Sequence, residues 1–347
     1  MEGSQKKGIG NLRRKALAVS TEHLVRTDLL CDGCPLPLVV EPSASDVDIV
    51  AWGRENVAFV NELLLKHGGI LFRRFNVRQV ETFEQFMQGV TSKLVSHVER
   101  SSPRTQVSGV IYTSTDHPAT QTIQLHNEQS YTHNWPMKIA FFCLQAPEEG
   151  GATPIADCRR VFDYIAPEIR ERFVGKKVMY VRNYGGGLGL SWQVAFQASD
   201  PSKVEEYCRA ADIGFEWRDG DWLRTRQIRE AIHNHPQTGE RLWFNHAYFF
   251  HYLSLEPEVR QALLAVMGPE DLPTNTFYGD SSPVEPDVME HIGNAYKRAT
   301  VRFPWQEGDI LLLDNMLVAH GREPFKGPRR ILVSIADPIH PDSDNLD

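Results

Sequence analysis

The sequence predicts a mainly β fold, a barrel or a sandwich, with helices on its flanks. Short apolar runs of strand length recur along the chain, for example at residues 70–75, 138–145 and 241–245. Helical periodicity is confined to a few separate segments. The regular alternation of strands and helices that characterises a doubly wound sheet is missing from the chain. These three observations favour packed antiparallel strands over a parallel sheet.

Apolar residues at helical spacing predict the flanking helices. Gly68 should end the first helix, and Asp157 should cap the start of the third. The predicted helices cover residues 45–66, 80–94, 158–172, 202–211, 257–267 and 286–298. Further strands are predicted within residues 107–125, at 152–156, in a hairpin over 215–225, and from residue 299 to the end.

The domain organisation follows from these elements. Residues 1–45 are polar and are predicted to form an irregular N-terminal arm, and residues 46–347 a single domain. Residues 185–189 are rich in glycine but lack the strand and helix that flank a nucleotide-binding loop. We therefore expect a lid over an active site around residues 185–222.

Composition excludes several classes of protein. The net charge of −8 disfavours a nucleic-acid or anionic-membrane binder, and no apolar run reaches the roughly 20 residues of a membrane span. The first residues lack the apolar segment of a secretory signal, which predicts a cytoplasmic protein with reduced thiols. Cys31 and Cys34 form a C-x-x-C without a second pair to complete a zinc site, so we expect an ordinary turn there.

A candidate metal site begins at His126 and Glu128. Residues two apart in an extended segment project to the same side, so this imidazole and carboxylate should share one space. They supply two of the three ligands in the facial triad of two histidines and one carboxylate, which leaves coordination positions open on a non-haem Fe(II). A distant apolar stretch, residues 308–322, offers His320 as the third ligand. No such pattern surrounds five other histidines, which we interpret as structural or substrate-facing: His133, His233, His235, His246 and His251.

Longer motifs around these residues resemble the TauD/TfdA-like family of Fe(II)/2-oxoglutarate-dependent oxygenases. The H-x-E form is similar to the clavaminate synthase-like branch, and in particular to the SyrP-like oxygenases. The resemblance runs from about residue 69 to 335, and it implies a double-stranded β-helix (jelly-roll) core. It is carried by residues 102–105, 111–115, 125–128, 130–131, 135–136, 150–157, 235–240, 243–245, 320–322 and 327–330.

The resemblance implies roles for single residues. His126, Glu128 and His320 match the iron ligands, and 2-oxoglutarate and O2 would be the cosubstrates. Arg330, ten residues after His320, matches the arginine that holds the far carboxylate of 2-oxoglutarate, with the adjacent Arg329 as the alternative. Thr153 matches the threonine that supports the same carboxylate.

The resemblance also narrows the reaction and the substrate. Ser334 stands where the taurine enzyme has its sulfonate-binding arginine, which argues against a sulfonate. An intact Glu128 favours hydroxylation over halogenation. SyrP-like relatives act on aminoacyl groups held by a peptidyl carrier protein, which implies an amino-acid-type substrate and a possible protein partner. From their chemistry and their proximity to the motifs, we interpret Arg104, Tyr131 and Arg224 as candidate substrate contacts.

Three alternatives remain open at this point. Desaturation or ring formation would use the same residues as hydroxylation. A zinc hydrolase could use the same two histidines and glutamate, although it would leave Arg330 and Thr153 without a purpose. A binding module that retains the fold without activity is the third alternative, and the complete triad argues against it.

Overall fold

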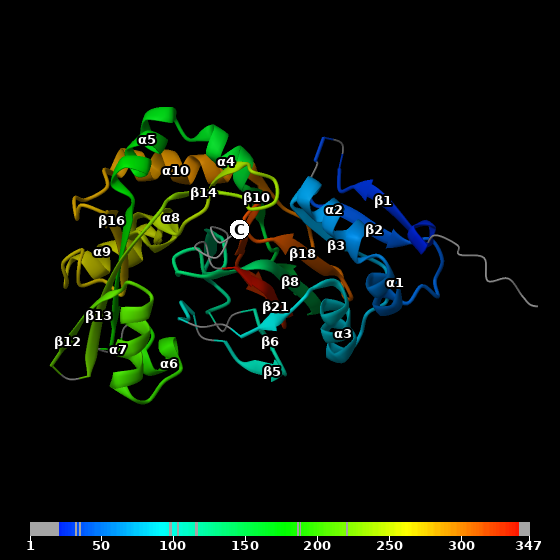
Figure 1. The fold of residues 1–347 in the computed structure, drawn as a ribbon, viewed down its shortest axis with the longest axis horizontal. Coiled ribbons are helices and arrows are strands. Elements are labelled where there is room, and N and C mark those ends of the chain that lie inside the picture. The colour runs from blue at the N-terminus through cyan, green and yellow to red at the C-terminus, as the bar shows by residue number, and fades with distance from the viewer. Residues whose placement is uncertain are drawn as a thin grey trace, which may run out of the picture.

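The molecule is built around two facing β-sheets, with helices at both ends (Figure 1). This computed structural model describes residues 21–31, 33–34, 36–96, 99–102, 104–114, 117–185, 187, 189–219 and 221–339. The first 20 residues of the predicted arm, and positions 186, 188 and 220 of the predicted lid, lie outside this set.

The larger sheet carries nine strands and forms one wall of the core. All of its neighbouring strands pair antiparallel except β2 and β3, which are parallel. Its order is β1 (Val25–Leu29), β2 (Leu38–Pro42), β3 (Gly69–Phe72), β18 (Ile310–Asp314), β8 (Trp135–Gln145), β21 (Arg330–Ile339), β6 (Ile111–Thr113) and β5 (Gln106–Ser108), with β4 (Leu94–Val95) beside β21.

The smaller sheet faces the larger one and carries the candidate site. Phe141 of β8 contacts His320 of β19 across the gap, with ring centroids 4.9 Å apart. The two sheets together confirm the predicted mainly β fold with its jelly-roll core. The strand order of the smaller sheet is β17 (Thr300–Val301), β10 (Ile155–Asp157), β19 (Val318–Arg322) and β7 (Ile123–His126).

A third sheet lies beside this core and contains the predicted hairpin. Its order is β12 (Gly214–Arg218), β13 (Trp222–Arg229), β11 (Val178–Tyr184) and β16 (Thr274–Tyr278). Two short pairs complete the strands that the structure describes: β14 (Ile232–Asn234) with β15 (Arg241–Trp243), and β9 (Glu149–Gly150) with β20 (Phe325–Lys326).

Helices form in each segment where apolar periodicity predicted one, but the segment predicted as one helix over 158–172 forms two, α4 and α5, and the short helices α6 and α8 were not predicted. The first predicted helix is divided at Asn56 and ends at Gly68, which adopts a left-handed conformation, and Asp157 caps α4. The α-helices are α1 (Ile49–Glu55), α2 (Val57–His67), α3 (Val80–Val90), α4 (Cys158–Tyr164), α5 (Pro167–Lys176), α6 (Trp192–Phe196), α7 (Pro201–Ala210), α8 (Ala247–Phe250), α9 (Pro257–Leu264) and α10 (Pro286–Ala299). Two short 3-10 helices are η1 (Thr21–Leu24) and η2 (Tyr252–Ser254).

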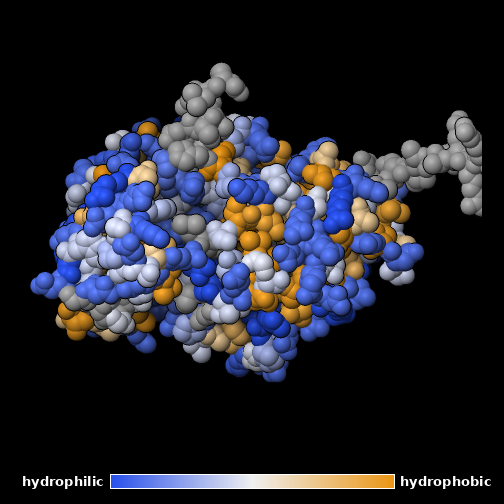
Figure 2. Space-filling view, turned by 60° about the horizontal axis from the view of Figure 1, so that its bottom comes forward, coloured by the Kyte–Doolittle hydropathy of each residue, from blue (hydrophilic) through white to orange (hydrophobic). Residues whose placement is uncertain are grey.

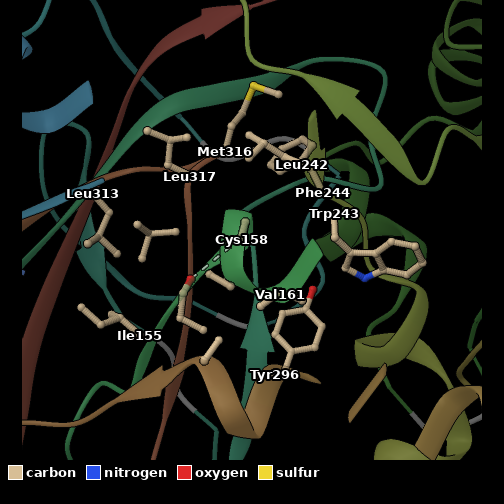
Figure 3. Close-up of a cluster of buried hydrophobic side chains, with 14 of the residues drawn as sticks. Ile155, Cys158, Val161, Leu242, Trp243, Phe244, Tyr296, Leu313, Met316 and Leu317 are labelled. Carbon is tan, nitrogen blue, oxygen red and sulfur yellow. Dashed lines mark hydrogen bonds between the residues drawn. The ribbon is translucent and has the colours of Figure 1, made fainter. Parts of the chain in front are cut away.

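The main core packs α4 between the smaller sheet and α10. Figure 3 shows Cys158 and Val161 of α4 among apolar side chains from distant parts of the chain, including Leu317 and Tyr296. The Cys158 thiol also accepts a hydrogen bond from the Asn127 amide, 3.3 Å away. This contact ties the core directly to the segment between the first two candidate ligands.

The N-terminal region corrects two predictions. Residues 25–42 were expected to be irregular, yet β1 and β2 form an antiparallel pair that extends the larger sheet. Buried Leu38 and Val40 give β2 an apolar face against the core, which outweighs the polar character of β1. Cys31 and Cys34, expected to be reduced, form a disulfide in the loop between these strands, with their Cα atoms 5.2 Å apart.

The segment predicted to be a lid forms a compact insert. Helices α6 and α7 pack on β12 and β13 around a small cluster that includes Trp192, Phe196 and Leu223. Figure 1 shows this insert at the lower left, away from α1 and α3. Its role as a lid stays a prediction.

The surface of the molecule is polar over most of the face shown in Figure 2, where apolar residues gather near the middle. Of the helices in the described part of the chain, none combines the length and the apolar character needed to cross a bilayer.

Gly68 offers a test of how the fold positions β19. Its φ is +79°, and a Cβ there would lie 2.7 Å from Cγ2 of Val318, two residues before His320. We expect Gly68→Ala to lower the free energy of unfolding by about 1–3 kcal/mol, because backbone strain adds to a clash with a stiff β-branched side chain. Chemical denaturation measures this loss.

Gly239→Ala is the matched control. Gly239 has a φ of +72° and open space around its Cβ position, so this change adds strain without a clash. Equal losses in the two variants would contradict the proposed contact between Gly68 and β19.

Candidate metal centre and anion pocket

His126, Glu128 and His320 come together as the sequence predicted. The candidate ligand atoms of the three side chains all lie within 4.8 Å of one another. The smaller sheet creates this proximity, because β19 pairs with β7 in a register that places His320 opposite His126. Glu128 follows two residues after His126, beyond the end of β7.

Hydrogen bonding and burial prepare the imidazoles to bind a metal. The Nδ1 atom of His126 lies 2.8 Å from the Gln124 carbonyl oxygen and donates to it, so Nε2 carries the free lone pair. Nε2 of His320 lies 3.9 Å from Oε2 of Glu128. Burial lowers the pKa of His126, and it holds the pKa of His320 well below its usual value. Both rings are therefore kept in the neutral form that ligates metals.

Asn315 fixes the backbone of Glu128. Its side-chain oxygen accepts from the Glu128 amide at 2.7 Å, and its Nδ2 donates to the carbonyl oxygens of Glu128 and Pro136, both at 2.8 Å. Asn127 in turn donates to the Asn315 carbonyl at 2.6 Å. No sequence motif predicted a role for Asn315; the available signal was a polar amide directly after the apolar run 310–313, and the structure shows it fully buried.

Arg104 contacts the metal site itself. Its Nη2 donates to Oε2 of Glu128 at 2.8 Å, and both side chains are almost fully buried. Nη1 of Arg104 is buried and has no hydrogen-bond partner among the described residues. The structure therefore places this predicted substrate contact directly beside the triad.

A second cationic pocket lies next to the triad along β10. Arg329 donates from Nε to the Gly151 carbonyl oxygen at 2.9 Å, and its Nη atoms reach Ser114 at 3.5 Å and Thr153 at 3.4 Å. Thr153 is two residues before Ile155, which pairs with His320. Burial and the nearby charge of Arg322 lower the pKa of Arg329 to about 10.

Arg329 is thus a largely buried cation with neutral partners. Within the described part of the chain, no carboxylate forms an ion pair with it. Burying a charge without a counterion is costly, so this pocket is suited to an anion supplied from outside the protein.

The structure favours the second of the two neighbouring arginines as the candidate for carboxylate binding. Arg330 was the first choice for binding the 2-oxoglutarate carboxylate, but its side chain is exposed at the start of β21. The irregularity in pairing between Arg330 and Ile331 sets which residue faces inward. Arg329, the alternative, reaches Thr153 instead.

Two other predicted substrate contacts are engaged within the protein. The Tyr131 hydroxyl donates to the Glu99 carbonyl oxygen, so its ring rather than its hydroxyl is available to line a pocket. Arg224 donates to Asn183 at 2.7 Å and to Asp271 at 2.5 Å. These bonds use Arg224 to hold the third sheet to the loop before β16, and the prediction that it contacts substrate finds no support here.

His246 is a polar group beside the triad that the sequence did not single out. Its ring lies 5.6 Å from the His126 ring and 4.7 Å from the Tyr131 ring, measured between centroids. Nδ1 lies 2.7 Å from the Ser130 hydroxyl, which can donate to it. Nε2 would then carry the proton, and it is buried with no partner among the described residues.

One cavity of the protein does not coincide with this chemistry. It has a volume of about 360 Å³ and is lined by residues of β7, α10 and the segments near Arg302 and Glu323, but by none of the triad. The candidate site is therefore defined by the geometry of its side chains.

The donor set fits a divalent iron. Two neutral imidazoles and one carboxylate from one side match the facial triad, and the supported Glu128 backbone keeps the carboxylate in place. The adjacent Arg329 pocket supplies the anion-binding group that a 2-oxo diacid requires. A hydrolytic zinc site would use the triad but would leave this second pocket unexplained.

Comparisons with known proteins agree with this geometry. Residues 34–335 match the family described as "Taurine catabolism dioxygenase TauD, TfdA family". The dapdiamide synthesis protein DdaC of Enterobacter agglomerans is 39% identical over 322 residues, which cover 93% of this chain and 97% of that protein. A clavaminate synthase-like protein of Arabidopsis thaliana is 28% identical and covers 87% of this chain and 93% of its own.

Solved structures show the same fold at low sequence identity. PvcB, described as an Fe, α-ketoglutarate-dependent oxygenase from an isonitrile synthetic pathway, superposes with a TM-score of 0.53 at 15% identity. That match covers 96% of this chain and 94% of PvcB. A taurine dioxygenase from Burkholderia xenovorans gives a TM-score of 0.50 at 16% identity, with 92% of each chain covered.

The hydrogen bonds between the Asn315 side chain and the backbone of Glu128 and Pro136 form a clamp. Asn315→Asp tests whether this clamp supports metal binding. The change removes the two Nδ2 donors and turns a new carboxylate toward the carbonyl oxygens of Glu128 and Pro136. We expect the affinity for Mn(II) or Co(II) to fall by about 10- to 100-fold, because the loss of a group that holds a metal ligand in place typically has an effect of this size. Isothermal titration of the chelator-treated protein measures it, and an unchanged affinity would reject the role of the clamp.

Proposed function

Because the chain belongs to the TauD/TfdA family of Fe(II)- and 2-oxoglutarate-dependent dioxygenases, we propose that it hydroxylates an unactivated C–H bond of an amino acid or aminoacyl group in natural-product biosynthesis. The observation that carries this proposal is the buried triad with an unpaired cationic pocket beside it.

The residues of the chain divide the work of binding. His126, Glu128 and His320 would hold Fe(II), and Arg329 with Thr153 would grip the far carboxylate of 2-oxoglutarate. Bound Fe(II) and 2-oxoglutarate together supply the oxidation: O2 is consumed, 2-oxoglutarate becomes succinate and CO2, and one oxygen atom enters the substrate. Asn315 keeps Glu128 oriented throughout, and the apolar contacts of His126 and His320 with Phe249 and Phe141 shield the site from water.

The relative DdaC supports a role in natural-product synthesis. Its name places it in dapdiamide synthesis, and the match covers almost the whole of both chains. We propose that the substrate of this protein is of the amino-acid type and is presented either free or as a thioester on a peptidyl carrier protein, in the cytoplasm. Desaturation and ring closure would use the same binding residues and differ only in the fate of the substrate radical.

Two buried donors beside the triad are suited to recognise this substrate. Nη1 of Arg104 and Nε2 of His246 both lack partners among the described residues, although each side chain lies next to a metal ligand. A carbonyl or carboxylate oxygen of the substrate would accept hydrogen bonds from both donors. A molecule without such an oxygen would leave the buried donors unpaired and would therefore bind more weakly. We therefore propose Arg104 and His246 as the groups that orient the aminoacyl oxygen.

The 2-oxoglutarate site is tested by comparing the two neighbouring arginines. Anaerobic addition of Fe(II) and then 2-oxoglutarate should produce a visible charge-transfer band in the wild type. We expect Arg329→Ala to weaken 2-oxoglutarate binding by about 100-fold or more, because it removes a charge-assisted pair, and Arg330→Ala to bind like the wild type. Titration of the band measures both affinities.

His126→Ala serves as the control that abolishes metal binding. A band that depends on Arg330 and not on Arg329 would reverse the assignment. Iron binding without any response to 2-oxoglutarate would contradict the proposed function itself.

Substrate recognition is tested through His246. The probes are the proteinogenic amino acids, each as the free acid and as its N-acetylcysteamine thioester, and the readout is stimulated succinate release. We expect His246→Leu to reduce the stimulation about tenfold without altering the charge-transfer band, and His246→Gln to retain part of it because its amide still donates. Full stimulation in His246→Leu would exclude His246 from recognition.

A further inference from the structure

The contact between Arg104 and Glu128 involves the carboxylate oxygen that faces the metal ligands. Nη2 of Arg104 lies 2.8 Å from Oε2 of Glu128, and this same oxygen lies 3.9 Å from Nε2 of His320. The guanidinium therefore contacts the same carboxylate oxygen that lies close to His320.

The buried carboxylate of Glu128 needs one cation to balance its charge. Side chains of Arg104 and Glu128 are 7% and 6% exposed, so neither charge is screened by water. Removing one partner of a buried pair leaves the other charge uncompensated, at a high cost in stability. A divalent metal bound by Glu128 would compensate the same carboxylate and would repel a guanidinium held against the same oxygen.

The backbone on both sides of Arg104 is anchored. On one side, the carbonyl oxygen of Arg100 accepts from Arg182 at 2.7 Å, and the Arg100 amide donates to the Ala195 carbonyl oxygen at 2.9 Å. On the other side, the amide of Thr105 donates to the Thr113 hydroxyl at 3.0 Å. A change in the position of the Arg104 guanidinium therefore needs only rotation of its long side chain.

We propose that Arg104 competes with the metal for Glu128, and that metal binding releases the guanidinium to face the substrate. Arg104 is thus a positioning residue that compensates Glu128 in the metal-free protein. The inference rests on the proposed function, since it assumes that the triad binds a divalent metal. Two events then follow in order. The metal first displaces Arg104 from Glu128, and only afterwards does Arg104 recognise an oxygen of the substrate.

The alternative has the opposite consequence for metal affinity. If Arg104 stayed on Glu128 beside the metal, it would orient the carboxylate, and its loss would weaken metal binding. If Arg104 competes, its loss removes a competitor and strengthens metal binding. The sign of the change decides between the two.

The experiment titrates Mn(II) into the chelator-treated full-length protein and follows binding by calorimetry. We expect Arg104→Gln to bind Mn(II) about tenfold more tightly than the wild type, and Arg104→Lys, which keeps the charge, to lie between them. Arg100→Gln is the matched control, because Arg100 lies on the same segment and bonds to Gln197, away from the triad residues in the described part of the chain. It should bind like the wild type.

Thermal unfolding provides a second readout. Metal-free Arg104→Gln should melt at a lower temperature than the metal-free wild type. Saturating Mn(II) should raise the Tm of this variant by more than it raises the Tm of the wild type. Weaker or unchanged Mn(II) binding in Arg104→Gln, with a folded protein and normal binding in the wild type, would overturn this inference alone. Failure of the wild type to bind Mn(II) would instead overturn the proposed function.

Discussion

The pairing of β19 with β7 is the constraint on which the site depends. It places His320 opposite His126, and it brings a residue near the C-terminal end of the domain within reach of the H-x-E motif. Gly321 makes this approach feasible, because a Cβ there would lie 2.6 Å from the Ile123 carbonyl oxygen. A side chain at this position would push the two strands apart and separate the ligands. The pairing also shifts register between His320 and Arg322, so the ligand sits at the edge of a local irregularity.

The alternation of side chains along strands explains how much the sequence could predict. It identified His126 and Glu128 as a pair, and His320 as their partner, because a period of two and a distant apolar strand suffice for that. The same alternation could not choose between Arg329 and Arg330, because the irregular pairing at the start of β21 decides which of them faces inward. Propensity also missed β1, whose polar residues pair with β2 at a sheet edge without needing apolar character.

Hydrogen-bond networks were harder to foresee than ligands. Asn315, His246 and Arg104 act through partners that are distant in sequence, and short motifs record residue types but not these contacts. Arg224 shows the reverse error. Its chemistry and its proximity to the motifs suggested substrate binding, but the folded chain supplies Asn183 and Asp271 as its partners.

The buried arginines differ in how their charge is balanced, and that difference assigns their functions. Arg182 is paired with Glu99 inside the protein and has a structural role. Arg104 is paired with a candidate metal ligand, for which a bound metal would compete, and Arg329 has neutral partners, which suits it to an anion from solution. Ser334, at the position of the sulfonate-binding arginine of the taurine enzyme, is fully buried, and its hydroxyl has no partner in the described part of the chain. With no cation at that position, recognition of a substrate oxygen is left to groups outside β21, such as Arg104 before β5 and His246 at the start of α8.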